Sequence, residues 1–516
     1  MKTYKKIISI LILLTLIIGC EKKLELQNPN MFTTDLYWQT DNDFLQGLAA
    51  TYKVFDTPWF GGYWGIKGIE IANGKGDDVF LINDVPCLYA LQSFTNDPNC
   101  KEVLAVFTQF YNGIFRANQI IEKAPDAPIS DGSKKQYLAE AKFLRGLNYF
   151  GLAINFGNVP IRLKVPGTKE DYFLQKSPEA DVWKQVFKDL LDAQADLPVA
   201  YPAEWTGRAT QGAATGFLGK AYLYYAQYDN TYFAKAETEL AKLLKAPYTY
   251  DLMENYGDNF RPETDNNKES LFEIEFQYVG GTVPWQYAGA DQTLGSVAGK
   301  EFGPAEAGGW FEFYPTNKIF DEFMKEKTAD GKVDTRAYAS IVWDGGTTDT
   351  LYYYQKVYNL TNFPNPYGFK CRLRKYQNWW GKDEKPVGLD QVSEINEKCL
   401  RFADILLLYG EALTMQDKVS DAYVPINRVR ARAKLAALPA GYSKDQMMTE
   451  IRHQRMIEFF REGQRFYDLK RWGLLETEMA NTDKPNHENF TMKYQYYPIP
   501  QAEIDANPGI TQNPPW

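Results

Sequence analysis

The most distinctive stretch of the chain lies near the C-terminus: Glu458-Phe-Phe-Arg-Glu-Gly-Gln-Arg-Phe-Tyr-Asp-Leu-Lys-Arg-Trp472. Acidic and basic residues recur at spacings of three, here and just before it: Arg455, Glu458 and Arg461, then Glu462, Arg465 and Asp468. Residues three apart are neighbours on the surface of a helix and can form ion pairs there. We therefore expect this stretch to be helical, with charges that form an ion-pair network bracing packed helices.

The same stretch contains two glutamates, Glu458 and Glu462, that would be the carboxylate pair if the protein were a glycosidase. Such enzymes need one carboxyl group with a raised pKa to act as the general acid. Neighbours on one helix, flanked by three arginines, would instead stay ionised. The residue pattern therefore favours a structural role over a catalytic one.

Upstream of this stretch, apolar residues at steps of three and four predict pairs of helices. The predicted helical segments are 102–124 with 143–154, 213–228 with 232–244, and 402–413 with 426–433. Within the second pair, Leu218-Gly219-x-x-Tyr222 matches part of the tetratricopeptide signature. The pairs begin near residues 102, 212 and 402, without a fixed period. We expect helix-turn-helix units interrupted by long insertions.

The longest such insertion extends from about residue 255 to 398, where glycine and proline are frequent and helical stripes are sparse. Apolar residues at 272, 274, 276 and 278 alternate there with polar residues at 273, 275 and 277. Strict alternation predicts a half-buried strand. The rest of the insertion predicts long loops, which commonly carry function.

Composition narrows the class of protein. The chain has 516 residues, a net charge of -9 and 35 Tyr, 31 Phe and 12 Trp. A negative net charge argues against a nucleic-acid partner, because phosphates require a basic face. The 44% hydrophobic content supports a large folded core and excludes a disordered chain.

The N-terminus predicts export and lipidation. Three lysines among residues 2–6 precede the apolar run 7–18, which is too short to span a membrane and is typical of a signal peptide. Ile17-Ile18-Gly19-Cys20 resembles the bacterial lipoprotein cleavage box. We expect residues 1–19 to be removed and Cys20 to carry the lipid; the alternative is a plain secretory signal with an incidental cysteine.

The other cysteines are Cys87, Cys100, Cys371 and Cys399, with only two histidines in the chain to join them. No CxxC pair is present, so the sequence does not favour a metal site. An oxidising envelope would permit a bond between Cys87 and Cys100, but spacing alone leaves the pairing open.

Aromatic residues outside the helical stripes are the candidate ligand site. They are Trp59, Phe60, Tyr63, Trp64, Trp285, Tyr287, Trp379 and Trp380, and the carboxylates Asp77 and Asp78 follow a glycine-bearing turn. A pyranose ring offers an apolar face to an aromatic ring and hydroxyls to nearby polar groups. The alternative for each ring is burial against the scaffold, which we expect most of all for Trp310. Three rings at about 0.5–1.5 kcal/mol each would give roughly millimolar to micromolar dissociation constants.

Several blocks, in order, are similar to the SusD/RagB family of surface lipoproteins. The blocks are the box ending at Cys20, then 26–30, 139–145, 207–210, 310–316, 334–336, 401–412, 458–472, 497–500 and 507–513. The resemblance spans nearly the whole chain, and the last four blocks are its most specific part. It implies one SusD-like domain over residues 20–516, mainly α-helical, with about four tetratricopeptide-like pairs in a right-handed scaffold, a loop-rich half and a few short strands.

The resemblance also implies a function: a lipid-anchored protein of the outer membrane, facing outward, that binds nutrients and acts as the lid of a SusC-like TonB-dependent transporter. It implies no catalysis, and no motif calls for a cofactor. The residues favour a glycan as the nutrient, although some family members bind peptides or other nutrients. Two alternatives remain open: a surface glycoside hydrolase, and a helical-repeat scaffold of the envelope that binds no small molecule.

Overall fold

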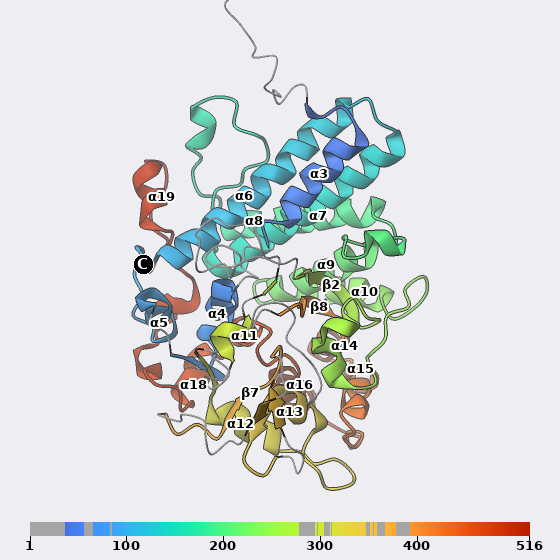
Figure 1. Ribbon diagram of the computed structural model, residues 1–516, viewed down its shortest axis with the longest axis vertical. Coiled ribbons are helices and arrows are strands. Elements are labelled where there is room, and N and C mark those ends of the chain that lie inside the picture. The colour runs from blue at the N-terminus through green and yellow to red at the C-terminus, as the bar shows by residue number, and fades with distance from the viewer. Residues whose placement is uncertain are drawn as a thin grey trace, which may run out of the picture.

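A computed structural model describes residues 37–55, 66–82, 85–277, 295–296, 298–303, 310, 312–346, 351–353, 356–358, 367–377 and 393–516. Over these residues the protein consists mainly of α-helices, with a few short strands (Figure 1). The prediction of a mainly helical chain is confirmed.

The long helices α6 (Lys101–Lys123) and α7 (Asp131–Phe156) form the first predicted pair and pack against each other (Figure 1). The apolar stripe of α6 is buried as expected, because its side chains face α7 and the shorter helix α3 (Asp41–Tyr52). Helix α8 (Glu179–Asp196) packs on α7. Helix α8 was not among the predicted helices, and it links the first predicted pair to the second.

The packing continues through the later helices. Helix α9 (Gln211–Tyr225) packs on α8 and on α10 (Tyr232–Lys242). A β-carbon at Gly219 would lie 2.7 Å from Leu240, so α9 can approach α10 this closely only because residue 219 is glycine. Helix α10 packs on α14, about 160 residues later in the chain, which explains how the long insertion leaves the helical scaffold continuous. The remaining helices of this region are α14 (Phe402–Met415), α15 (Val419–Arg432) and α16 (Lys444–Glu458).

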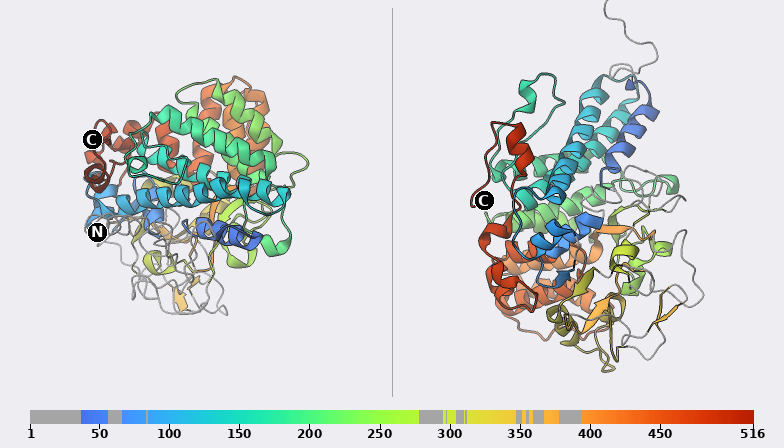
Figure 2. Two further views of the ribbon diagram at one scale, coloured as in Figure 1. Left: turned by 90° about the horizontal axis from the view of Figure 1, so that it is seen from above. Right: turned by 60° about the vertical axis from the view of Figure 1, so that its left-hand side comes forward.

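Between α10 and α14 the described residues form short elements, which Figure 2 (right) shows gathered away from the long helices α6 to α8. The helices are α11 (Ala298–Phe302), α12 (Asn317–Met324) and α13 (Thr335–Ser340). The strands form antiparallel pairs: β1 (Val79–Leu81) with β3 (Phe313–Pro315), β4 (Ile341–Trp343) with β7 (Cys371–Leu373), β5 (Leu351–Tyr353) with β6 (Lys356–Tyr358), and β2 (Ser270–Ile274) with β8 (Glu397–Arg401).

Strand β2 is the strand predicted from alternation, but it is shorter and more deeply buried than expected. Glu273, predicted to face solvent, is buried and its Oε2 lies 2.7 Å from Lys398 Nζ of β8. Glu275, two residues on, is exposed. The alternation pattern thus identified the strand, whereas the buried ion pair depends on a partner 125 residues away.

Elements near the two ends of the described chain pack together. Near the N-terminal end lie α4 (Ile66–Gly74) and α5 (Pro86–Gln92), and near the C-terminal end α17 (Arg465–Arg471), α18 (Leu475–Ala480) and α19 (Gln501–Ala506). Helix α17 packs on α4, and the hydroxyl of Tyr497 donates a hydrogen bond of 2.9 Å to the carbonyl of Ile71. The C-terminal segment therefore helps to hold the N-terminal elements in place.

Most buried apolar side chains belong to one large core along the helices α3 to α10 and α14 to α17. A second core lies among β1, β3, β4, β7, α12 and the end of α16. Within the described residues, no helix is both long enough and apolar enough to cross a membrane.

Candidate functional site

Most residues predicted to bind ligand lie outside the described part of the chain. These are Trp59, Phe60, Tyr63, Trp64, Trp285, Tyr287, Trp379 and Trp380, together with the predicted lipidation site Cys20. Their roles stay predictions.

Asp77 and Asp78 are described, and neither reaches the surface: their exposed fractions are 0% and 2%. Both oxygens of Asp77 bind Arg465, with Nε to Oδ1 at 2.7 Å and Nη2 to Oδ2 at 2.8 Å, and Lys318 Nζ lies 2.7 Å from Oδ2. Burial would raise the pKa of Asp77, but Arg465 and Lys318 outweigh it and lower that pKa to about 2. A ligand at the surface would not contact these carboxylates, so we assign Asp77 to the scaffold.

The neighbouring carboxyl group of Asp78 is in the opposite electrostatic situation. Burial, and next the charge of Asp77, raise the pKa of Asp78 to about 7. Its main-chain carbonyl accepts a hydrogen bond of 3.0 Å from the amide of Thr316, which ties the approach to β1 to the end of β3. Asp78 is thus also a structural residue and not the surface group that was predicted.

The charged C-terminal stretch does not form the single helix that was expected. Helix α16 ends at Glu458, and α17 begins at Arg465. Between them the main chain turns, with positive φ angles at Arg461 (69°) and Gly463 (68°). The expected pairs at spacings of three are therefore mostly replaced by contacts with distant parts of the chain.

Glu458 is the centre of this ionic cluster. Its Oε1 accepts hydrogen bonds from Arg401 Nη1 at 3.0 Å and from Arg432 Nη2 at 2.5 Å, and its Oε2 accepts one from Arg336 Nη1 at 3.1 Å. The side chain is fully buried. Burial would raise the pKa of Glu458, but the charges of Arg432, Arg401 and Arg336 hold it well below its usual range.

The other charges of the stretch are paired in the same way. The pairs are Arg455 with Asp404 and Asp468, Arg461 with Glu397, Arg471 with Glu411 and Asp468, and Glu462 with Arg401 and Lys375. The predicted role of the stretch in bracing the fold is confirmed, with mostly different partners. Because Glu458 and Glu462 are both buried in ion pairs, neither carboxylate can reach a glycosidic bond.

An aromatic groove lies on the surface between the loop before α9 and the segment after α10. Its volume is about 480 Å³, and its ring-bearing and polar lining residues include Tyr201, Trp205, Thr206, Tyr248, Tyr250, Asn266, Asn267 and Lys268. Trp205 is 40% exposed. The loop that carries it is fixed by Arg208, whose guanidinium lies 5.0 Å from the Trp205 ring and whose Nε donates to Glu140 of α7 at 3.0 Å.

This groove combines an exposed ring with amide and ammonium groups, which is the set of groups that a sugar requires. Trp205 was not among the predicted ligand-binding residues. Trp205 lies in Pro202-Ala-Glu-Trp-Thr-Gly207, a proline- and glycine-bearing loop like those used to select the other tryptophans, so the same signal would have found it.

Trp310 differs from the expectation of burial, because 40% of it is exposed. It lies three residues before β3, whose Tyr314 packs edge-on against the half-exposed Tyr367. Aromatic side chains of the insertion therefore reach the surface here as well.

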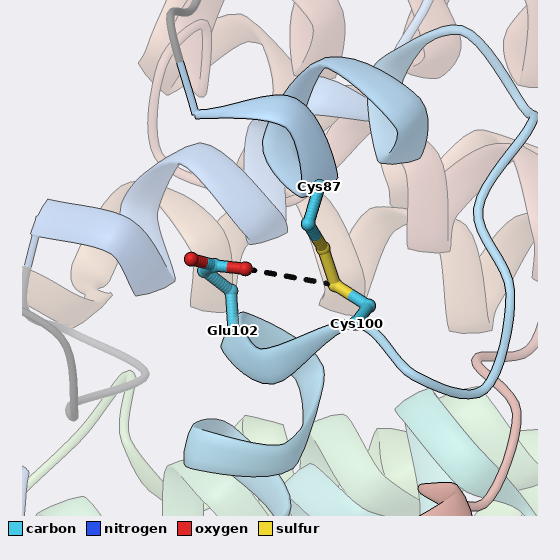
Figure 3. A group of neighbouring side chains, drawn as sticks. All are labelled: Cys87, Cys100 and Glu102. Carbon is cyan, nitrogen blue, oxygen red and sulfur yellow. Dashed lines mark hydrogen bonds between the residues drawn. A yellow bond between two sulfur atoms is a disulfide. The ribbon is translucent and has the colours of Figure 1, made fainter.

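The pairing of Cys87 and Cys100, left open by the sequence, is a disulfide that joins α5 to the residue preceding α6 (Figure 3). Glu102 Oε2 lies 3.9 Å from Cys100 Sγ. Two sulfurs joined in a disulfide offer no thiolate, so this group is not arranged to bind a metal ion. Cys371 and Cys399 are free thiols in the interior.

Comparison with known proteins follows the blocks noted in the sequence. The family described as "SusD family" matches residues 268–516, and the family described as "Starch-binding associating with outer membrane" matches residues 77–223. The crystal structure of a SusD superfamily protein from Bacteroides vulgatus is 35% identical, with a TM-score of 0.82, and the match covers 93% of this chain and 100% of that one. This chain belongs to the SusD family.

Two further members of the SusD family indicate what relatives bind. A structure named "Laminarin binding SusD-like protein" is 24% identical, with a TM-score of 0.77, over 93% of this chain and 100% of that chain. The starch-binding protein SusD of Bacteroides thetaiotaomicron is 23% identical over 88% of this chain and 89% of its own length. Both names refer to binding of a glycan.

Proposed function

We propose that this SusD-family protein is a non-catalytic lipoprotein of the outer membrane that binds an oligo- or polysaccharide. It delivers the glycan to a SusC-like TonB-dependent transporter and acts as the lid of that transporter. The observation that carries the proposal is the exposed Trp205 beside a 480 Å³ groove on a chain of this family.

The groove supports a glycan rather than another nutrient. A sugar ring can place its C–H face on the exposed indole of Trp205 while its hydroxyls reach Asn267 and Lys268 in the same groove. The loop tryptophans predicted from the sequence, Trp59, Trp64 and Trp285, would add further platforms outside the described residues. Each platform adds little free energy, which suits a protein that must release its ligand to a transporter.

The lipid anchor and the transporter belong to the same proposal. Cys20 would carry the lipid and hold the protein at the outer face of the outer membrane. Replacing Cys20 with alanine should abolish labelling with a radioactive fatty acid and release the protein from membranes. Co-purification from membranes of a large TonB-dependent barrel with the wild-type protein would support the transporter partnership, and its absence after crosslinking would contradict it.

The glycan itself is tested with the full chain purified in detergent and a panel of polysaccharides that includes starch and laminarin. We expect binding by affinity electrophoresis and calorimetry, weakened about three- to tenfold by Trp205→Ala, since one aromatic contact contributes about 0.5–1.5 kcal/mol. Tyr172→Ala is the matched control, because Tyr172 is also an exposed aromatic residue but does not line the groove. A triple variant of Trp59, Trp64 and Trp285 tests the predicted loop platforms separately.

The alternatives give different results in the same assays. New reducing ends appearing in the polysaccharide would identify a glycoside hydrolase. Failure of every glycan to bind, together with resistance to protease added to whole cells, would identify an internal envelope scaffold. Unchanged affinity in both the Trp205→Ala protein and the triple variant would refute these sites while leaving membership of the family intact.

A further inference from the structure

Arg374, directly after β7, differs from most arginines of the interior. Most of them contact carboxylates: Arg145, Arg336, Arg401, Arg430, Arg432, Arg455, Arg461, Arg465 and Arg471. Arg372 of β7 instead donates hydrogen bonds to the main-chain carbonyls of Phe369 and Cys371. The Arg374 side chain is half-buried, and within the described residues its guanidinium makes no hydrogen bond and no ion pair. Its main chain is held normally, because its amide donates 2.9 Å to the carbonyl of Ser340.

The Arg374 side chain lines a polar pocket of about 250 Å³, which we call the Arg374 pocket. Its walls are the 3₁₀ helix η5 (Tyr256–Phe260), helix α13 and the residues after β7. A second arginine, Arg261, also lines it. The acidic residue in the lining is Asp258, whose Oδ1 accepts a hydrogen bond of 2.9 Å from Asn255 Nδ2.

Two further side chains of the pocket clarify its chemistry. The lysine beside Arg374, Lys375, points its Nζ to Glu462 at 2.5 Å and so is already neutralised. Gln377 is 2% exposed and donates from Nε2 to the carbonyl of Ala298 at 3.1 Å, but within the described residues its Oε1 receives no hydrogen bond. Among the described residues, the pocket thus holds the Arg374 cation without an ion-pair partner and the Gln377 Oε1 acceptor without a donor.

Leaving a partly desolvated guanidinium without a carboxylate is unfavourable. Burial, and then the like charge of Arg261, lower the pKa of Arg374. An anion in the pocket would relieve both effects, since a guanidinium binds a carboxylate or a sulfate with two parallel hydrogen bonds.

We propose that the Arg374 pocket binds the carboxylate or sulfate group of an acidic glycan. This inference rests on the proposed function for the statement that the anion is carried by a sugar. A hydroxyl of that sugar supplies the donor that Gln377 lacks, and Thr335 and Asn255 are polar groups in the same lining. At 250 Å³ the pocket is smaller than the roughly 300–1,000 Å³ that encloses a whole drug-sized ligand, so it suits one charged sugar unit of a longer chain.

The test uses the full chain in detergent and three polymers with one backbone: dextran, carboxymethyl dextran and dextran sulfate. The variant is Arg374→Gln. The control is Arg116→Gln, which removes the same charge from α6, at the other end of the molecule from α13 in Figure 1. Affinity is measured at low and at high salt, because attraction between exposed charges is screened by ions.

We expect at least one acidic polymer to bind the wild-type and Arg116→Gln proteins about tenfold or more tightly than Arg374→Gln, the range expected for charged hydrogen bonds. Comparing the affinities for carboxymethyl dextran and dextran sulfate shows whether the pocket prefers a carboxylate or a sulfate. Equal affinity of the Arg374→Gln and Arg116→Gln proteins for both acidic polymers would overturn the inference, whether that affinity is high or absent. A second variant, Arg261→Gln, gives the same test should Arg374→Gln fail to fold.

The melting temperature and the pattern of ligand binding distinguish an anion site at Arg374 from a structural role for Arg374 and from failure of the proposed function. A structural role for Arg374 would lower the melting temperature of Arg374→Gln without ligand, whereas an anion site leaves that temperature unchanged or higher. If neutral starch or laminarin binds and Arg374 has no effect on acidic polymers, the proposed function stands and the inference fails. If no glycan binds but free sulfate stabilises wild type more than Arg374→Gln, the anion site stands and the proposed glycan function fails.

Discussion

Two arginine sites next to helix α13 differ in one respect. At the first, Arg336 of α13 joins Arg401 and Arg432 around the buried carboxylate of Glu458. At the second, Thr335 and Tyr338 of the same helix line the Arg374 pocket, where the Arg374 guanidinium has no carboxylate among the described residues. The arginines of the first site contact a carboxylate within the fold, and Arg374 does not.

This difference distinguishes charged residues that stabilise the fold from a charged residue that is available to bind a ligand. Breaking a buried, fully paired cluster strands its remaining charges and destabilises the fold. Removing a cation that has no partner leaves nothing stranded. Stability measurements on matched variants therefore test whether the two sites differ as described.

The largest effect is expected for Glu458→Gln. The variant leaves Arg336, Arg401 and Arg432 without their shared negative charge, and we expect a loss of about 3–5 kcal/mol in the free energy of unfolding. Urea denaturation followed by circular dichroism measures it. The control is Glu263→Gln, because Glu263 is 63% exposed, lies 3.4 Å from Arg261 and should contribute less than about 1 kcal/mol. Similar losses of unfolding free energy for Glu458→Gln and Glu263→Gln would show that the buried cluster stabilises the fold no more than an exposed ion pair does.

A smaller loss is expected for Asp77→Asn. Lys318 keeps its contact of 2.6 Å with Glu478 in this variant, so mainly Arg465 is left without a full partner. We expect a loss of about 2–3 kcal/mol by the same measurement. Asp181→Asn, at the exposed pair with Lys184, is the control. A neutral result for Asp77→Asn would contradict the assignment of Asp77 to the scaffold.

The contacts of His453 with two glutamates can be weakened by raising the pH. His453 of α16 has Nδ1 2.5 Å from Glu322 Oε1 and Nε2 3.1 Å from Glu326 Oε2. Burial would lower the pKa of His453, but hydrogen bonds to Glu322 and then Glu326 outweigh it and raise that pKa to about 9. Because the folded pKa lies above the unfolded value of about 6.5, the stabilisation is complete below pH 6.5 and disappears as pH rises through 9.

The variant that isolates this effect is His453→Gln, which keeps a polar side chain without the charge. We expect wild type to exceed it by on the order of 2 kcal/mol at pH 6, and by little above pH 9. The difference between the two proteins is the quantity to measure, since burial lowers the pKa values of Lys470 and Lys484 to about 7 and these groups titrate in the same range with the opposite sign. A difference that does not change between pH 6 and pH 10 would contradict the assignment.

The smallest effect is expected for Arg374→Gln without ligand. No described carboxylate loses a partner in this variant, so the free energy of unfolding should change by less than about 0.5 kcal/mol or increase slightly. The same denaturation series as for Glu458→Gln provides the comparison. A loss above about 2 kcal/mol would mean that Arg374 stabilises the fold as the arginines around Glu458 do, and that the two sites do not differ.

The sequence predicts those parts of the fold that depend on neighbours along the chain. The stripe that defines α6 is local, and five of its six residues, Val103, Phe107, Phe110, Ile114 and Ala117, are buried, whereas Ile121 is partly exposed. Val182, Val186 and Leu190 of α8 also recur at steps of four and are buried, so α8 was detectable in principle. The break between Glu458 and Arg465 was not predicted, because the residues of the turn, Arg461 and Glu462, pair with Glu397 and Arg401, which are distant in the sequence.

The candidate binding residues could likewise not be predicted where their position depends on residues distant in the sequence. Asp77 follows a glycine turn, which predicts exposure, but a partner 388 residues away holds it inside. Nothing in the spacing of Arg261 and Arg374, 113 residues apart, indicates that they share a pocket. Residues that act through distant partners require coordinates, whereas exposed tryptophans in proline- and glycine-bearing loops can be selected from the sequence.

The last twenty residues of the chain complete hydrogen bonds at the end of α7. The amide of Tyr497 donates 2.7 Å to the carbonyl of Asn155, and Asn513 Nδ2 donates 2.7 Å to the carbonyl of Phe156. A ribosome makes these acceptors more than 340 residues before it makes their donors. Helix α7 can therefore reach its final state only after residues 497–513 have been synthesised, and a chain truncated before them would expose this helix end to proteases.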